Sequence, residues 1–216
     1  RVAASAKESD ELNELAAQHG RRFLRLPWQL HAEPNAADAC KQITEMQALG
    51  YRLHVAINVS IFQFAQADFV DSLCEQCKTH GVEPSCIEIE ITEGLLMRDA
   101  DNLRGVLDQL RRHGFRVALD DFGTGYSSLA YLSQLPIDVL KIDKSFIHSA
   151  TTDHFRAELI KAILSIARCL NQEVVAEGVE TPEQADFLAA EGCQLAQGFL
   201  FSKAVPREQL LGMFGA

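Results

Sequence analysis

Apolar positions along residues 51–216 switch repeatedly between the period of a strand and the period of a helix. Short β-branched or strictly alternating runs predict strands at residues 53–59, 86–91, 116–120, 139–143, 173–176 and 194–197. Apolar spacings of three and four predict helices at residues 69–80, 102–113, 153–170 and 206–214, and another that begins after Thr181. Strands separated by helices indicate an α/β fold with a mostly parallel sheet.

Several of these helices carry end signals or a clear apolar face. Gly81 and Gly114 follow two of them, where a glycine ends a helix in the left-handed conformation. Thr181, Pro182 and Gln184 occupy the N-cap, the first helical position and the capping-box position. In the long helix, one apolar stripe predicts the buried face: Phe155, Leu159, Ile163, Ile166 and Leu170.

Polar residues lie at or just past the carboxyl end of six different predicted strands: Asn58, Glu90, Asp120, Lys141, Glu177 and Gln197. An open doubly wound sheet fits the strand count, but it would spread these positions along an edge too wide for one ligand. In a (β/α) barrel the strand ends converge on one mouth, where active sites are found. We therefore predict a barrel whose earliest strands lie in, or before, the first 50 residues.

Length and charge narrow the function classes. The 216 residues suit one large domain or two small ones, and we expect a single domain over 1–216. The chain has 20 Lys and Arg against 30 Asp and Glu, a net charge of −10. This charge argues against a protein that binds a DNA or RNA polymer over a broad surface. A small phosphorylated ligand held through metal ions is not excluded. Because no apolar run approaches the roughly 20 residues that span a bilayer, and residues 1–20 are mostly polar, we expect a cytoplasmic chain without a membrane segment.

The six cysteines fall mostly on predicted helix or strand faces, which is usual for a reduced, cytosolic protein. Cys74 and Cys77 form a CxxC pair that would suit half of a metal site. Because no second CxxC or paired histidine follows at zinc-site spacing, we interpret them as helix residues one turn apart.

Four carboxylates are expected at the predicted mouth: Glu90, Asp120, Asp121 and Glu177. Carboxylates packed together repel one another unless they are protonated or share cations. Oxygen ligands of this kind, with the amide oxygens of Asn58 and Gln197, suit Mg²⁺ or Mn²⁺. One carboxylate pair would bridge two metals for in-line attack on a phosphate ester. Lys141 would hold a nucleophilic water or neutralise a phosphate oxygen.

The segment DDFGTGY at residues 120–126 is the sharpest local signal. Adjacent strand residues point to opposite faces, so both aspartates face one site only if the chain leaves the strand there. Gly123 and Gly125 permit that turn and a close approach of the backbone to a ligand. A DFG triplet also occurs in kinases, but the other kinase motifs are missing, so we exclude that class.

The sequence at this point resembles the EAL-domain family of bacterial cyclic di-GMP phosphodiesterases. The matching segments are INVS (57–60), EIEITEGLLM (88–97), LDDFGTGYSSLAYLSQLPIDVLKIDKSF (119–146), VVAEGVETPEQ (174–184) and GCQLAQGFLFSKA (192–204). The resemblance implies a modified TIM (β/α)8 barrel with one antiparallel strand. It implies hydrolysis of cyclic di-GMP to linear pGpG with two ions of Mg²⁺ or Mn²⁺. It also implies a homodimer, and an upstream sensory or GGDEF domain in a larger signalling chain.

Residue by residue, the resemblance implies metal ligation by Asn58, Glu90 and Asp120, with Asp121 at the second metal. Lys141 would position the attacking water, Glu177 would act as its general base, and Gln197 would help to hold the water or the substrate. The resemblance also assigns two anchors and four members of the loop after Asp121. The anchors are Glu93 and Glu180, and the loop residues are Phe122, Gly123, Thr124 and Gly125.

The match is good over residues 37–216 and poor over residues 1–36. The Glu-Ala-Leu triplet that names the family, and whose Glu binds metal, does not occur in residues 1–57. Three explanations are open: upstream residues that the chain omits, a truncation, or a degenerate member that has lost one ligand. Besides the phosphodiesterase, two other functions therefore stay open: a cyclic di-GMP receptor without catalysis, and a protein-interaction domain. The retained Glu177, Lys141 and aspartates favour the enzyme.

Overall fold

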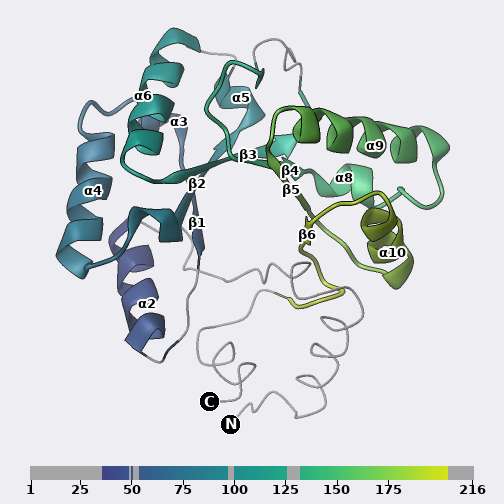
Figure 1. The fold of residues 1–216 in the computed structure, drawn as a ribbon, viewed down its shortest axis with the longest axis horizontal. Helices are drawn as coiled ribbons and strands as arrows, with labels where there is room; N and C mark the ends of the chain where they lie inside the picture. The colour runs from purple at the N-terminus through teal and green to yellow at the C-terminus, as the bar shows by residue number, and fades with distance from the viewer. Residues whose placement is uncertain (1–35, 49, 51–53, 97–99, 126–131, 204–216) are drawn as a thin grey trace. The chain divides into compact units, whose positions relative to one another are not determined.

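The computed structural model describes residues 36–48, 50, 54–96, 100–125 and 132–203. Its six strands follow the order β1-β2-β3-β4-β5-β6, with each strand hydrogen-bonded to the next in the chain (Figure 1). The chain divides into two compact units after Leu140, inside β4. The described residues of the first unit run to 140, and those of the second begin at 141.

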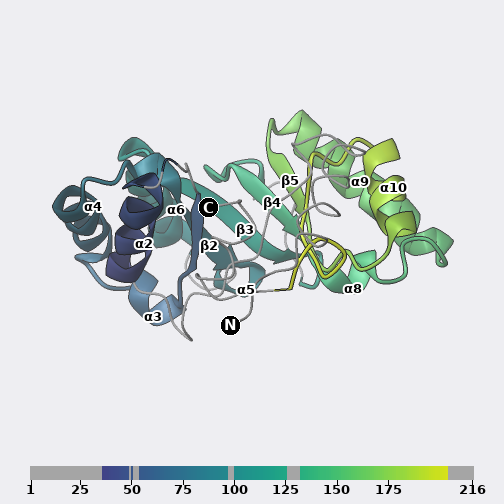
Figure 2. The ribbon, with the colours of Figure 1, turned by 90° about the horizontal axis from the view of Figure 1, so that it is seen from below.

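The first unit combines three parallel strands with helices. The strands are β1 (Val55–Asn58), β2 (Ile87–Thr92) and β3 (Arg116–Phe122). The helices are α2 (Ala36–Ala48), α3 (Ile61–Phe64), α4 (Phe69–His80), α5 (Glu93–Leu96) and α6 (Ala100–Arg112), with a 3-10 turn, η1, at Pro84–Cys86. Helix α4 packs against α2 and α6, and these three helices lie side by side in both views (Figures 1 and 2).

Strand β2 shows why the alternating run folds as predicted. Ile87, Ile89 and Ile91 have no exposed surface, and the register places Ile89 beside Val117 of β3 on the same face. The intervening glutamates therefore point to the other face of the sheet. That face is also buried at β2, where Glu88 forms a 3.5 Å ion pair with Arg116.

The second unit contains β4 (Val139–Ile142), which starts in the first unit, with β5 (Glu173–Ala176) and β6 (Leu195–Ala196). Strands β5 and β6 are parallel, and the Glu177 amide extends the ladder by donating to the Ile142 carbonyl at 3.1 Å. The helices are α8 (Lys144–Ile147), α9 (His154–Cys169) and α10 (Pro182–Ala190), and α9 packs against both β5 and α8. Among the helices of the described ranges, none has both the length and the apolar character needed to cross a membrane.

The predicted strands and most helices are confirmed to within about three residues at each end. Gly81 and Gly114 end α4 and α6 with φ values of 65° and 91°, and Thr181 and Gln184 form the capping box of α10. Strand β3 runs two residues past the predicted end at Asp120, and helices α2, α3, α5 and α8 were not predicted. The predicted helix at 206–214 lies outside the described residues.

Of the predicted apolar stripe of α9, Ile163 is buried, Leu159, Ile166 and Leu170 are half-buried, and Phe155 is exposed. The buried residues of α9 are Ile160, Ile163, Leu164 and Ala167. Phe155 is 72% exposed, and it is the second residue of this helix. Apolar residues stand next to each other at 159–160 and 163–164, so two stripes about 100° apart fit the sequence, and the small Ala167 adds to the one that packs.

Candidate functional site

Three oxygen-bearing side chains share one face of the first unit's strands. In the parallel register Asn58 lies beside Glu90, and Asp120 lies one pleat further along, beside Thr92. Because residues two apart in a strand point the same way, Asn58, Glu90 and Asp120 project from the same side. Glu90, on the middle strand, is buried, whereas Asp120 is half-buried and Asn58 is exposed.

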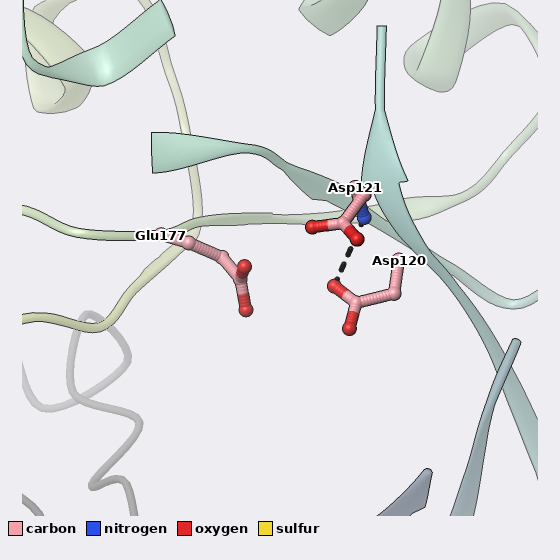
Figure 3. Close-up of side chains that lie close together, drawn as sticks. All are labelled: Asp120, Asp121 and Glu177. Atoms are coloured by element: carbon pink, nitrogen blue, oxygen red, sulfur yellow. Dashed lines mark hydrogen bonds between the residues drawn. The ribbon is translucent and has the colours of Figure 1, made fainter. Parts of the chain in front are cut away.

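The two consecutive aspartates lie close together because the backbone leaves the regular strand conformation at Asp121. Its φ is 55°, in the left-handed region that non-glycine residues rarely adopt and that aspartate tolerates better than most. Carboxylate oxygens of Asp120 and Asp121 lie within 4.8 Å of one another. The Asp121 amide also donates to Asp120 Oδ1 at 3.0 Å (Figure 3). A conformation of this kind costs on the order of 1–3 kcal/mol and occurs most often at functional sites.

A buried glutamate holds the loop that follows the aspartates. Glu93, the first residue of α5, is 4% exposed. Its Oε2 accepts hydrogen bonds from the amides of Gly123 at 3.2 Å and Gly125 at 2.9 Å. A Cβ at Gly125 would come within 3.0 Å of the Glu93 carboxyl carbon, so a side chain there would press on the carboxylate. Within the loop, the Thr124 hydroxyl donates to the Asp121 carbonyl at 2.8 Å.

A second cluster lies in the second unit and joins Lys141, Glu177 and Gln197. Lys141 Nζ is 2.8 Å from Glu177 Oε1, and Gln197 Nε2 donates to the same oxygen at 2.6 Å. Lys141 belongs to β4, whereas Glu177 and Gln197 directly follow β5 and β6. Glu177, also drawn in Figure 3, thus receives an ammonium and an amide donor. This direct ion pair with Lys141 was not part of the sequence prediction.

Gly198, which the sequence did not single out, lets the segments after β5 and β6 lie close together. The Gln197 amide donates to the Ala176 carbonyl at 2.8 Å, and the Val179 amide donates to the Gln197 carbonyl at 3.1 Å. A Cβ at Gly198 would collide with the backbone nitrogen and carbonyl oxygen of Val179. The sequence signal was a glycine directly after each of the two candidates, Glu177 and Gln197.

Other predicted residues have simpler surroundings. Phe122 is buried at the end of β3. Glu180 is exposed and its amide donates to Gln184 Oε1 at 2.8 Å, so its role as a loop anchor stays a prediction. Cys74 and Cys77 both lie in α4, which confirms the helical interpretation of the CxxC pair. All six cysteines are free thiols.

The donors of the first unit have the chemistry of a site for hard cations. Asn58, Glu90, Asp120 and Asp121 offer only amide and carboxylate oxygens, which Mg²⁺, Mn²⁺ and Ca²⁺ prefer. No sulfur or imidazole belongs to this set. The residues therefore fit a divalent cation, and the approach of the two aspartate carboxylates is the arrangement that such a cation would stabilise.

Comparison with known proteins gives consistent matches. The EAL domain family model matches residues 36–204. The chain is 45% identical over 175 residues to the bifunctional diguanylate cyclase/cyclic di-GMP phosphodiesterase MucR of Pseudomonas aeruginosa, a match that covers 81% of this chain and 26% of that protein. It is 36% identical over 169 residues to the cyclic di-GMP phosphodiesterase PdeR of Escherichia coli, covering 78% and 26%. The chain thus spans about a quarter of the length of these curated relatives.

Solved structures give the same result for the fold. The PaMucR phosphodiesterase in complex with c-di-GMP matches with a TM-score of 0.78 at 44% identity, over 81% of this chain and 71% of that one. The Klebsiella pneumoniae BlrP1 manganese/c-di-GMP complex matches with a TM-score of 0.69 at 28% identity, over 94% and 46%. The predicted α/β fold, a modified TIM barrel of EAL type, is therefore confirmed. Since the family model covers most of the chain, including the two aspartates and the glutamate that follows β5, this chain belongs to the EAL domain family.

Proposed function

We propose that this chain is a cyclic di-GMP phosphodiesterase that opens the cyclic dinucleotide to linear pGpG with the help of divalent cations. Family membership supports the substrate, since MucR and PdeR are cyclic di-GMP phosphodiesterases and the PaMucR structure contains c-di-GMP. The observation that carries the catalytic proposal is the 2.8 Å contact between Lys141 and Glu177.

We assign the cation ligands to the oxygen-bearing residues of the first unit: Asn58, Glu90, Asp120 and Asp121. The shared face of the three strands and the close approach of the two aspartates support this assignment. We propose Mg²⁺ or Mn²⁺ as the cations, and two ions per site. Structures of BlrP1 contain calcium or manganese together with c-di-GMP. A bound cation would supply electrostatic stabilisation of the phosphate oxygens as negative charge develops in the transition state.

We propose Glu177 as the general base for the attacking water. Lys141 and Gln197 both contact Glu177 Oε1, so the carboxylate is fixed in the orientation that a base requires. The water oxygen would attack phosphorus, the bond from phosphorus to the 3′-oxygen would break, and the leaving oxygen would take up a proton. The products of that step are a 5′-phosphate and a free 3′-hydroxyl, the ends of linear pGpG. Gln197 would position Glu177 and help to hold the water or substrate.

The loop at residues 122–125 would couple substrate binding to the aspartates. Glu93 accepts from two amides of this loop, which supports its role as an anchor, and we assign Glu180 as a second anchor. We further propose that the chain acts in the cytoplasm as a homodimer. The MucR relative also carries a diguanylate cyclase, and a cyclase or sensory domain linked to this chain would fit the same signalling role.

The experiment that tests this proposal compares wild type with Glu177→Gln in two assays. Removal of a general base lowers the rate by roughly 10²–10⁴-fold, whereas cyclic di-GMP affinity measured by calorimetry should stay within a few-fold. Glu173→Gln is the matched control, because Glu173 lies in the same strand region at the opposite end of β5. It should leave both quantities unchanged.

Each alternative function gives a different outcome. If the wild type binds cyclic di-GMP but hydrolyses none with either metal, the chain is a receptor and not an enzyme. Neither binding nor turnover would favour a protein-interaction domain. Unchanged turnover in Glu177→Gln would contradict the role assigned to Glu177.

A further inference from the structure

Gln184 is a buried polar residue in the first turn of α10, and its side chain joins the start of this helix to the end of α8. The residue is 4% exposed. Its Oε1 accepts hydrogen bonds from the amides of Glu180 at 2.8 Å and Thr181 at 3.1 Å. Its Nε2 donates to the carbonyl of His148, the C-cap residue of α8, at 3.4 Å. Since backbone amides only donate, the side-chain oxygen has to face them, and the side-chain nitrogen then faces the carbonyl.

This side chain does more than cap a helix. The capping box needs only an oxygen at Gln184, which accepts from the N-cap amide of Thr181, and glutamate serves that purpose as well as glutamine. A glutamate carboxylate, however, would place an oxygen against the carbonyl oxygen of His148 at a buried position. The contact with α8, and not the cap, therefore explains why an amide suits this position.

The two segments that Gln184 joins carry the charged residues of the second cluster. Lys141 lies in β4, which leads directly into α8, and Glu177 follows β5 at the start of the loop that leads into α10. The two segments also pack closely beside the cluster, because a Cβ at Gly178 would collide with the Cβ of Lys144, the first residue of α8. The Gln184 contact thus closes the far end of an interface whose near end is the ion pair.

The backbone that begins at Glu177 is held by a series of hydrogen bonds. The Glu177 amide donates to the Ile142 carbonyl at 3.1 Å. The Val179 amide donates to the Gln197 carbonyl at 3.1 Å. The next two amides donate to Oε1 of Gln184. This single oxygen therefore fixes the end of the loop that carries the carboxylate.

We propose that Gln184 is a positioning residue for the phosphodiesterase reaction, which fixes the loop of Glu177 to the α8 segment and so keeps the carboxylate at Lys141. The inference rests on the proposed function, in which Glu177 is the general base. Misplacement of a reacting group by about 1 Å lowers a rate by up to roughly 10²-fold. Loss of the Gln184 contacts should therefore lower kcat, whereas KM should stay nearly unchanged because Glu177 acts in the chemical step.

The test compares two variants of Gln184. Gln184→Met keeps the length of the side chain and loses its three hydrogen bonds, whereas Gln184→Glu keeps the two accepted bonds and loses the donated one. Below the melting temperature of each variant, kcat for cyclic di-GMP should fall roughly 10–10²-fold in Gln184→Met and by less in Gln184→Glu, with KM within about two-fold. Hydrogen exchange at the Glu180 and Thr181 amides should be faster in Gln184→Met only, a readout that does not depend on activity.

Thr181→Ala is the matched control, because it weakens the start of the same helix and leaves the Gln184 side chain in place. It should lower the melting temperature and keep kcat at the wild-type value. Wild-type kcat in Gln184→Met, a raised KM with unchanged kcat, or an equal loss of kcat in Thr181→Ala would each overturn the positioning role alone. No hydrolysis by the wild type would overturn the proposed function and this inference together. If Gln184→Met does not fold, wild-type kcat in Gln184→Glu overturns the proposal and a lowered kcat supports it.

Discussion

The contact between Glu93 and the glycine loop allows a quantitative prediction. Replacement by Gln keeps one oxygen acceptor and the shape of the side chain but removes the charge, and replacement by Ala removes both hydrogen bonds. We expect the loop after Asp121 to open more easily in both variants and more so in Glu93→Ala. The buried carboxylate and its two backbone donors give the reason.

The expected magnitude comes from those two bonds. A hydrogen bond to a charged group contributes about 1.5–3 kcal/mol and one between neutral groups about 0.5–1.5 kcal/mol. Gly123 and Gly125 are exposed, so water replaces Glu93 when it is removed, and the lower ends of these ranges apply. We therefore expect a loss of about 1–2 kcal/mol in Glu93→Gln and about 2–4 kcal/mol in Glu93→Ala.

Hydrogen exchange at the Gly123 and Gly125 amides measures this directly. A loss of 1–2 kcal/mol corresponds to exchange roughly 5–30 times faster. Glu75→Gln, an exposed position in α4 of the same unit, is the control and should exchange like wild type. Equal exchange at both glycines in wild type and Glu93→Ala would refute the conclusion that Glu93 holds the loop.

Three further predictions concern the second unit. Gly198→Ala should lower phosphodiesterase activity several-fold and also lower the melting temperature, because the added Cβ would collide with the Val179 backbone. Gly94→Ala is the control: Gly94 has open space around it, so neither quantity should change. Burial raises the pKa of the Cys193 thiol from 9.0 to about 11. As pH rises, the thiol therefore loses its proton first in the unfolded state. The stability that the buried neutral thiol contributes is complete below about pH 9 and is lost as pH rises to about 11. Melting temperatures across that window should therefore fall more in wild type than in Cys193→Ala, and equal falls would contradict the assignment. Thr181→Ala removes the N-cap of α10 and should lower the free energy of unfolding by about 1 kcal/mol in urea denaturation; no change would mean that the cap is dispensable.

Local patterns in the sequence predicted the elements well because their causes are local. The alternation of CIEIEI determines which side of β2 each residue faces, and it predicted that Glu90 opposes the isoleucines. Gly81 ends α4 as expected because only the backbone of that turn is involved. The turn at Asp121 was also expected, since two adjacent aspartates cannot share a site within a regular strand.

The features that the sequence did not predict depend on contacts between distant segments. Nothing near Lys141 in the sequence indicates that it pairs with Glu177, because the contact forms only when β4 and β5 lie side by side. The collision that excludes a side chain at Gly198 likewise involves the backbone of Val179 from another loop. The face of α9 was ambiguous because neighbouring apolar residues fit two stripes, and packing chose the one through Ile160.

The central claim is that this EAL domain hydrolyses cyclic di-GMP with a divalent cation, and product analysis tests it most directly. Purified chain should be incubated with cyclic di-GMP in Mn²⁺, in Mg²⁺ and in EDTA, and the nucleotides separated by chromatography and identified by mass. The account predicts linear pGpG with at least one of the two cations and none in EDTA. Intact cyclic di-GMP under all three conditions would contradict it, as would equal hydrolysis in EDTA.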